Sequence, residues 1–375
     1  MGQYFSTDTR ASGTFTKALS DDLTSEYFNY VNKLKLKDPK GNELTLTSTN
    51  EGTYYDYLKS VIEESLNNFL EDTSFPYTPS SGSGEGGPGG GSGDGPGGDP
   101  PSGDPPSGDP PDKSRLRNLD TYETAADYIA SLNANKEWIT LDSTTKKYTI
   151  SNVGDFVTNC KKATKSVGAF DSLGKTQAEN KLFGISYSTY TKHFDSIMAN
   201  LLTNKASTYS SLSNWETSYP TDYTNDLSVI DKLGKTISYR VNMYNPMYYI
   251  HSNYEGYKSS DVADYFRINT GITQEDTSSV VEMNLFLALT NYGKNVSFTT
   301  VWNKGHTEAE RSGSATDNFI SWIAKIEGVS DDSTETTSTT TESTNENGSS
   351  ILRSTNINLS NLNKLMISLL FICLL

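Results

Sequence analysis

Apolar residues recur at helical spacing in some parts of the chain and alternate with polar residues in others. Alternation predicts a short hairpin over 138–150 and two longer strands over 265–270 and 296–302. Helical spacing is found over the following ranges: 19–36, 54–70, 122–132, 153–165, 197–202 and 279–291. The pattern therefore predicts a mixed α/β protein, with most helices ahead of the two longer strands.

The two longer strands enclose one helix. Ser279 and Glu282 have the spacing of a capping box at its start. The apolar residues of 279–291 leave almost no polar side, so we expect this helix to be buried. In an open parallel sheet, the loops at the carboxyl ends of the strands form the ligand crevice. We therefore expect the site in the loops that follow these two strands.

Both loops carry residues suited to proton transfer. The loop after the first strand contains Glu275 and Asp276, and the loop after the second contains His306 directly after Gly305. A carboxylate and an imidazole that lie close together are two members of an acyl-transfer triad. His306 and one of these two carboxylates are therefore the candidate catalytic pair.

Two segments flank this unit. We expect 237–250 to return to the sheet core, with Pro246 marking a bend. Glu308, Glu310 and Arg311 follow the candidate histidine, and we interpret them as a solvated helix face, because runs of charge usually are. The alternative is that these charges line the site.

Composition narrows the function classes. The 375 residues carry a formal net charge of −15, which argues against nucleic acid as a partner. The 23 Tyr, 14 Phe and 4 Trp are expected mainly in the core, although exposed aromatic rings would suit phenolic or sugar ligands. The three histidines lack metal-ligand spacing, so we expect neither a metal nor a cofactor. Cys160 is expected as a buried free thiol.

Low-complexity segments divide the chain. Residues 79–112 are rich in Gly, Ser, Pro and Asp and are expected to be disordered. They separate two mainly helical parts, 14–78 and 113–235. The sheet-forming part spans 236–328, and a Ser/Thr-rich stalk suited to O-glycans spans 329–350.

The last segment, 351–375, ends in eleven mostly apolar residues, too few to span a bilayer. Small residues, a polar spacer and an apolar end form the signal for a GPI anchor. Sequons at Asn295, Asn347 and Asn358 are compatible with a secreted glycoprotein. A GPI signal requires entry into the secretory pathway, and no signal peptide opens the sequence. We therefore expect an extracellular, surface-anchored protein whose N-terminal part, with the signal peptide, lies upstream.

Five segments resemble the C-terminal part of the tannases and their feruloyl-esterase-like relatives, most closely the bacterial-type tannases. These segments are 240–249, 266–271, 276–278, 305–311 and 315–323, within a likeness that covers about 13–328. The resemblance implies a partial α/β-hydrolase sheet with an inserted helical lid, formed here by 14–78 and 113–235. It also implies a nucleophilic serine, an acid and a histidine in that order along the chain.

His306 occupies the place of the family's catalytic base. Many relatives carry an aspartate where this chain has Gln274, and we assign the acid to Asp276, with Glu275 the nearest competitor. No Gly-x-Ser-x-Gly occurs in the sequence. The resemblance places this motif and the oxyanion loop upstream, so we expect the chain alone to be inactive.

The expected function is that of the C-terminal portion of a secreted carboxylic ester hydrolase acting on phenolic esters of the tannin or feruloyl type. A small phenolic ester or a plant cell-wall ester would be the substrate. The protein would contact a membrane only through its C-terminal lipid anchor. The alternative is an inactive, surface-anchored binding or adhesion protein. An upstream reading frame that encodes Gly-x-Ser-x-Gly and a signal peptide would favour the first hypothesis. The sequence leaves the ester and the oligomeric state open.

Overall fold

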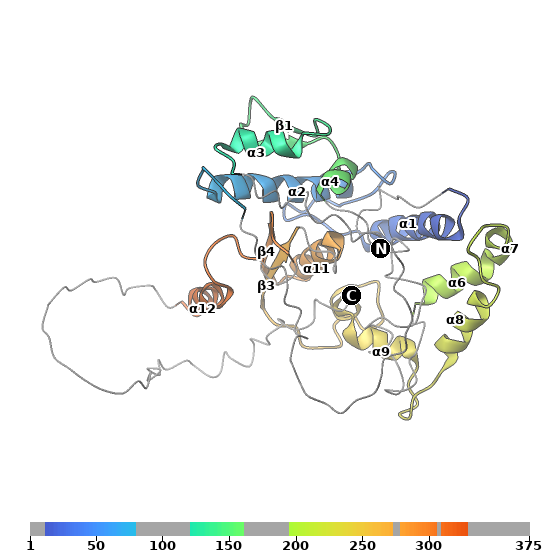
Figure 1. The fold of residues 1–375 in the computed structure, drawn as a ribbon. Coiled ribbons are helices and arrows are strands. Elements are labelled where there is room, and N and C mark those ends of the chain that lie inside the picture. The colour runs from blue at the N-terminus through green and yellow to red at the C-terminus, as the bar shows by residue number, and fades with distance from the viewer. Residues whose placement is uncertain (1–11, 80–120, 161–194, 273–277, 306–308, 329–375) are drawn as a thin grey trace, which may run out of the picture.

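The computed structural model describes residues 12–79, 121–160, 195–272, 278–305 and 309–328 (Figure 1). The helices are α1 (Phe15–Leu34), α2 (Thr53–Asp72), α3 (Ala125–Leu132), α4 (Val153–Cys160), α6 (Ser196–Asn204), α7 (Ala206–Tyr209), α8 (Tyr219–Ser228), α9 (Ile237–Tyr244), α10 (Pro246–Ile250), α11 (Ser279–Asn291) and α12 (Ala315–Ile326). The strands are β1 (Ile139–Leu141), β2 (Tyr148–Ile150), β3 (Tyr265–Gly271) and β4 (Asn295–Val301). The mixed α/β composition expected from the sequence is confirmed. The stalk, the terminal segment and residues 80–112 lie outside the described residues.

Two long helices, α1 and α2, provide much of the N-terminal half of the core. Thr14 caps α1 by accepting a hydrogen bond from the backbone N–H of Lys17. Apolar residues one helical turn apart face inward on α2, where Leu58, Ile62 and Leu66 are almost fully buried. The helices predicted from periodicity are therefore confirmed here.

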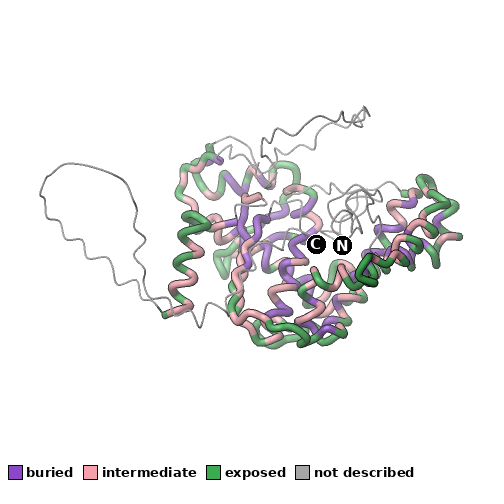
Figure 2. The backbone as a smooth tube through the Cα atoms, turned by 90° about the horizontal axis from the view of Figure 1, so that it is seen from below, coloured by how far each residue is buried: buried purple, intermediate pink, exposed green. Residues whose placement is uncertain are grey.

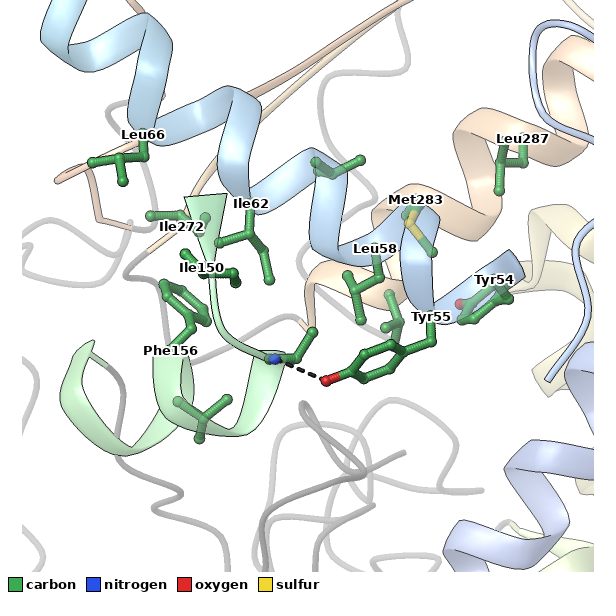
Figure 3. Packing of buried hydrophobic residues seen from close by; sticks show 14 of the residues in the cluster. Tyr54, Tyr55, Leu58, Ile62, Leu66, Ile150, Phe156, Ile272, Met283 and Leu287 are labelled. Carbon is green, nitrogen blue, oxygen red and sulfur yellow. Dashed lines mark hydrogen bonds between the residues drawn. The ribbon is translucent and has the colours of Figure 1, made fainter. Parts of the chain in front are cut away.

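The small hairpin β1–β2 is antiparallel, as predicted, and lies against α2. Asn67 of α2 fixes this contact with two hydrogen bonds to the backbone of Tyr148: its Oδ1 accepts from the N–H and its Nδ2 donates to the carbonyl. The hydroxyl of Tyr55 accepts a hydrogen bond from the N–H of Val153 at the start of α4 (Figure 3). Both polar groups of the tyrosine–backbone pair are thereby satisfied inside an apolar cluster.

The segment 237–250 forms two short helices, α9 and α10, where the sequence led us to expect a return to the sheet. Thr236 caps α9, and Asn245 caps α10 by accepting from the N–H of Met247. Pro246 occupies the first position of α10, where a missing N–H costs nothing. Met247 and Ile250 still belong to the main core.

The strand–helix–strand unit is present as predicted. β3 and β4 pair in parallel, with Tyr265 opposite Asn295 and Gly271 opposite Val301. The predicted capping box is wrong. The N-cap is Ser278, its side chain makes no capping bond, and the Glu282 carboxylate instead accepts a hydrogen bond from Thr270.

Two apolar clusters organise the described residues. The larger one joins α1, α2, α3, the hairpin and α4 with β3, α11 and β4, and Figure 3 shows part of it around Leu58, Met283 and Leu287. The smaller one joins the first turns of α1 to α6 and α8. The first helical part, the N-terminal portion of the second and the sheet-forming part therefore share one core, although residues 79–112 separate the two helical parts in sequence.

Candidate functional site

The carboxyl ends of β3 and β4 lie in direct contact. Ile272 extends the pairing by donating its N–H to the carbonyl of Val301 at 3.0 Å. A Cβ added to Gly271 would lie 2.7 Å from the carbonyl carbon of Lys304 and closer still to the carbonyl oxygens of Lys304 and Gly305. The absence of a side chain at 271 therefore allows the backbone of the second loop to pass over the end of β3.

The candidate catalytic residues begin where this contact ends. Asp276, together with Glu275, lies in 273–277, and His306 lies in 306–308, and both segments are outside the described residues. The structure thus brings Gly271, two positions before the first segment, against Gly305, which immediately precedes the second. The mutual geometry of Asp276 and His306 stays a prediction.

The histidine loop is anchored before His306 by two hydrogen bonds, one buried and one partly buried. The indole Nε1 of Trp302 donates to the hydroxyl of Tyr128 at 2.8 Å, and both rings are buried. Asn303 has a positive φ of 59°, and its side chain donates to the hydroxyl of Tyr77 at 2.8 Å. Asparagine tolerates this left-handed conformation better than most residues do. These two bonds fix the entry to the loop.

Two ion pairs anchor the loop after His306. Arg267 of β3 binds both carboxylate oxygens of Glu310, at 2.7 and 2.5 Å. Arg311 binds both oxygens of Asp72 at the end of α2, at 2.7 and 2.8 Å. A bidentate ion pair of this kind, in which a guanidinium group binds both oxygens of a carboxylate, fixes the relative orientation of the two side chains as well as pairing their charges. Neither Glu310 nor Arg311 lies in a helix, so the predicted helix face is wrong. The Glu310 side chain is largely shielded from solvent, whereas Arg311 is exposed as predicted, and Glu308 lies outside the described residues.

The Arg267–Glu310 ion pair is less exposed to solvent than the Arg311–Asp72 pair. The Arg267 and Glu310 side chains are only 19 % and 14 % exposed. Burial alone would raise the pKa of Glu310, but hydrogen bonds from Arg267 and Asn318 outweigh it and hold that pKa below its usual value. The hydrogen bond from Asn318 at 2.9 Å also attaches α12 to this pair. One carboxylate thus links β3, the histidine loop and α12.

A second carboxylate lies on the opposite face of β3. Glu282, in the first turn of α11, is only 1 % exposed and accepts a hydrogen bond from the Thr270 hydroxyl at 2.9 Å. Thr270 immediately precedes Gly271, so this buried acid lies directly behind the loop contact. This position was not predicted from the sequence, because the spacing of Glu282 from Ser279 suggested a cap. The absence of any polar side to the helix was the available signal that Glu282 would be buried.

Among the described residues, His251 is the one histidine and Cys160 the one cysteine. His251 is 9 % exposed, and its Nε2 lies 2.9 Å from the carbonyl of Leu34. Burial lowers the pKa of this imidazole. Cys160 is a free thiol at the end of α4 whose pKa burial raises. Within the described residues, no group of three or more His, Cys, Asp or Glu side chains could hold a metal ion.

No family model and no curated protein matches the chain. Solved structures similar to it include tannases. A Fusobacterium nucleatum tannase is 24 % identical, with a TM-score of 0.49, and the match covers 82 % of this chain and 46 % of that one.

Two further similar structures are of tannin acyl hydrolases with bound ligands. One, in complex with ethyl gallate, is 18 % identical, with a TM-score of 0.47, and the match covers 83 % of this chain and 47 % of that one. The other, in complex with 3,4-dihydroxybenzoate, is 17 % identical, with a TM-score of 0.49, and the match covers 87 % and 52 %. The chain spans about half the length of the structures it matches. The resemblance to tannases indicated by the five sequence segments is thus also found among solved structures.

Proposed function

We propose that this chain supplies the acid and the base of a carboxylic ester hydrolase whose substrates are phenolic esters of the tannin or feruloyl type. The observation that supports the proposal is the contact between Gly271 and the backbone of Lys304 and Gly305. His306 follows Gly305 directly, and Asp276 lies five positions after Gly271. A chain can span up to about 3.5 Å per residue, so the two functional groups are within reach of each other.

In the proposed reaction, His306 removes the proton from a serine hydroxyl, and the serine oxygen attacks the ester carbonyl. Asp276 holds the imidazole in the correct tautomer and stabilises its charged form. The protonated imidazole then gives its proton to the departing alcohol, leaving an acyl-enzyme. Water, deprotonated by the same imidazole, hydrolyses the acyl-enzyme and releases the carboxylic acid.

The serine and the oxyanion donors are proposed to come from polypeptide outside this sequence, because no Gly-x-Ser-x-Gly occurs within it. The phenolic substrate class rests on the sequence resemblance described above. The surrounding anchors suit such a reaction, since Trp302, Asn303, Glu310 and Arg311 fix both ends of the segment that contains His306.

The test compares residues 1–375 with the protein purified from its source, using methyl gallate and p-nitrophenyl acetate. Residues 1–375 alone should show no hydrolysis above background, since the nucleophile and oxyanion donors supply most of the rate enhancement. The source protein should hydrolyse methyl gallate, and His306→Ala should lower kcat by roughly 10³-fold or more. Hydrolysis by residues 1–375 that His306→Ala abolishes would show that the nucleophile lies within this sequence.

A matched pair of variants identifies the acid. Asp276→Asn should lower kcat by roughly 10³–10⁴-fold, because the imidazole loses the partner that holds its tautomer. Glu275→Gln, one position earlier, should change kcat only a few-fold. The reverse ranking would assign the acid to Glu275. A source protein without any hydrolysis of phenolic esters would favour the inactive binding protein instead.

We also propose that the mature protein is attached to the cell surface by a GPI anchor added near residues 347–350. The support is the composition of 329–375. No helix among the described residues is long and apolar enough to cross a membrane. Treatment of intact cells with a phosphatidylinositol-specific phospholipase C should release the protein into the medium, and retention on the cells would contradict the anchor.

A further inference from the structure

Exposed hydrophobic side chains are concentrated between the end of α8 and the end of α9. Among the described residues, eight large hydrophobic side chains are exposed. Four of the eight lie in 230–243: Ile230 is 59 % exposed, Leu233 83 %, Tyr239 46 % and Met243 56 %. Tyr239 and Met243 are one helical turn apart on α9, so they lie on the same side of that helix. Scattered hydrophobic residues are normal on a protein surface, whereas a group of this kind indicates an interaction site.

The loop between the two helices, residues 230–236, is fixed by its own hydrogen bonds. An antiparallel bridge joins its two ends. The Oδ1 atom of Asp231 accepts hydrogen bonds from the N–H groups of Leu233 and Lys235, both at 2.9 Å. The Oδ2 atom accepts one from Arg240 of α9, also at 2.9 Å. Because the backbone on both sides of Leu233 is held in place, burying that side chain against a partner carries a small ordering cost.

The charges beside these hydrophobic side chains are mainly positive. Lys232 directly precedes Leu233, Lys235 follows it by two positions, and both lysines are exposed. The ammonium group of Lys235 lies 4.5 Å from the centre of the Tyr239 ring. The segment contains three basic residues and one acidic residue, Asp231, whose carboxylate already accepts the hydrogen bonds described above. A local excess of positive charge therefore accompanies the hydrophobic side chains, on a chain whose formal net charge is −15.

The position of the loop favours a partner with a soft, extended surface. Figure 1 shows the loop below α8 and α9, on the side of the molecule away from α2, and Figure 2, viewed from below, shows exposed backbone there. A projecting hydrophobic tip fits a second protein only where that protein offers a matching pocket, whereas the interface of a lipid bilayer accepts it without one. Aliphatic side chains with Lys and Tyr beside them are typical of segments at this interface, because the Lys stem and the Tyr ring are apolar while their ends are polar.

We propose that the loop 230–236 and the exposed side of α9 form a contact site for the surface of a phospholipid bilayer. Ile230 and Leu233 enter the boundary between the headgroups and the acyl chains, and Lys232 and Lys235 bind the headgroup phosphates. This inference goes beyond the proposed function, and no candidate catalytic residue takes part. The proposed GPI anchor would hold the loop near such a surface and raise its effective concentration there, although the contact does not depend on the anchor.

A small anionic ligand explains these residues less well. Such a ligand would bind Lys232 and Lys235, but it would leave Ile230 and Leu233 in contact with water. A bilayer accounts for both sets of side chains at once. The proposal therefore requires that the hydrophobic side chains and the positive charges each contribute to binding.

Flotation of residues 1–375 with vesicles of phosphatidylcholine and a minority of phosphatidylserine tests the hydrophobic contribution. The double variant Ile230→Ser/Leu233→Ser should lower the partition coefficient by at least roughly 10-fold, since two side chains lose their burial in the apolar boundary. The matched control Leu141→Ser/Ile320→Ser removes two exposed side chains elsewhere and should leave the coefficient within roughly 2-fold. Both variants should melt within about 3 °C of the unmodified chain, because all four side chains are exposed. Equal effects of the two variants, or no binding of the unmodified chain, would overturn the proposal.

The positive charges are tested in the same assay. Lys232→Gln should lower the partition coefficient by roughly 5-fold, because a lysine near an anionic membrane surface is attracted to it. Lys147→Gln, in the exposed connection between β1 and β2, removes the same charge elsewhere and should leave the coefficient within roughly 2-fold. Binding that disappears in Lys232→Gln but persists in Ile230→Ser/Leu233→Ser would identify an anion site and overturn the bilayer contact.

A fluorophore on the loop itself separates this contact from binding through the terminal apolar segment, which all these samples contain. Leu233→Cys and, as the control, the exposed Ser143→Cys carry the same environment-sensitive label, with Cys373→Ser in both chains. Burial raises the pKa of Cys160 and keeps that thiol unreactive. Addition of vesicles should shift the emission to shorter wavelength at position 233 and leave it unchanged at position 143. A shift at neither position, or an equal shift at both, would overturn the proposal.

Discussion

The contact between the two loops depends on a glycine, and adding one methyl group to it should be costly. In Gly271→Ala, the new Cβ would lie 2.7 Å from the carbonyl carbon of Lys304 and nearer still to the carbonyl oxygens of Lys304 and Gly305. Contacts below 3.0 Å essentially never occur for real Cβ atoms. The obstructing atoms are backbone, so no side-chain rotation relieves the overlap.

The magnitude follows from the displacement that the methyl group forces. The histidine loop would have to retreat by roughly 1 Å, and overpacking of this kind costs about 1–3 kcal/mol, occasionally more. The anchors Trp302–Tyr128 and Asn303–Tyr77 resist that movement, because both hydrogen bonds would have to lengthen. We therefore expect Gly271→Ala to lower the free energy of unfolding by about 3 kcal/mol, with a fall in Tm of roughly 6–12 °C.

Urea denaturation followed by tryptophan fluorescence measures this change, and Gly305→Ala is the matched control. Gly305 belongs to the same contact, but a Cβ added there meets no atom within 4 Å. Its substitution should change the free energy of unfolding by no more than about 0.5 kcal/mol. Equal effects of the two substitutions would refute the close approach of the loops. In the source protein, Gly271→Ala should also lower kcat, because displacement of the loop moves His306.

Four further predictions concern charged and buried polar groups. Arg267→Lys should lower the free energy of unfolding by about 1–2 kcal/mol, and Arg311→Lys should lower it by less than about 0.5 kcal/mol, because the Arg311–Asp72 ion pair is more exposed than the Arg267–Glu310 pair. Equal losses of stability in urea denaturation would contradict this ranking. The lowered pKa of Glu310 stabilises the folded protein at pH values above the usual pKa of a carboxyl group, and this stabilisation should disappear as the pH falls through the folded-state pKa. The urea midpoint should therefore fall between pH 7 and pH 3, and it should fall less in Glu310→Gln than in the unmodified protein. Asn284 accepts a hydrogen bond from the buried hydroxyl of Tyr54 and donates one to the hydroxyl of Tyr27. Asn284→Leu should therefore lower the free energy of unfolding, measured by urea denaturation, by about 2–4 kcal/mol. Burial raises the pKa of Tyr27 to about 12, so its stabilising contribution should be constant below about pH 10 and should be lost as the pH rises through 12; a Tyr27→Phe variant with the same alkaline unfolding profile would contradict this.

Local patterns determined most of the secondary structure. Apolar residues at helical spacing predict α1, α2 and α6, and alternation predicts β3, β4 and the small hairpin, because each pattern exposes or buries one side of a single element. The same reasoning failed at 237–250, where capping by Thr236 and Asn245 and the placement of Pro246 favour two short helices over a strand. Aromatic and apolar content alone does not separate these outcomes.

Only the tertiary structure decided how the candidate site is supported. The sequence identified Asp276 and His306 from their loops and from family resemblance, but it gave no sign that Arg267 lies beside Glu310 or that Arg311 reaches Asp72, which is 239 positions away. Such contacts depend on the path of the chain in space, whereas periodicity reports only which side of one element is buried. Glu282 shows the same limit, because its spacing from Ser279 fits a local cap while the fold places it against Thr270 inside the core.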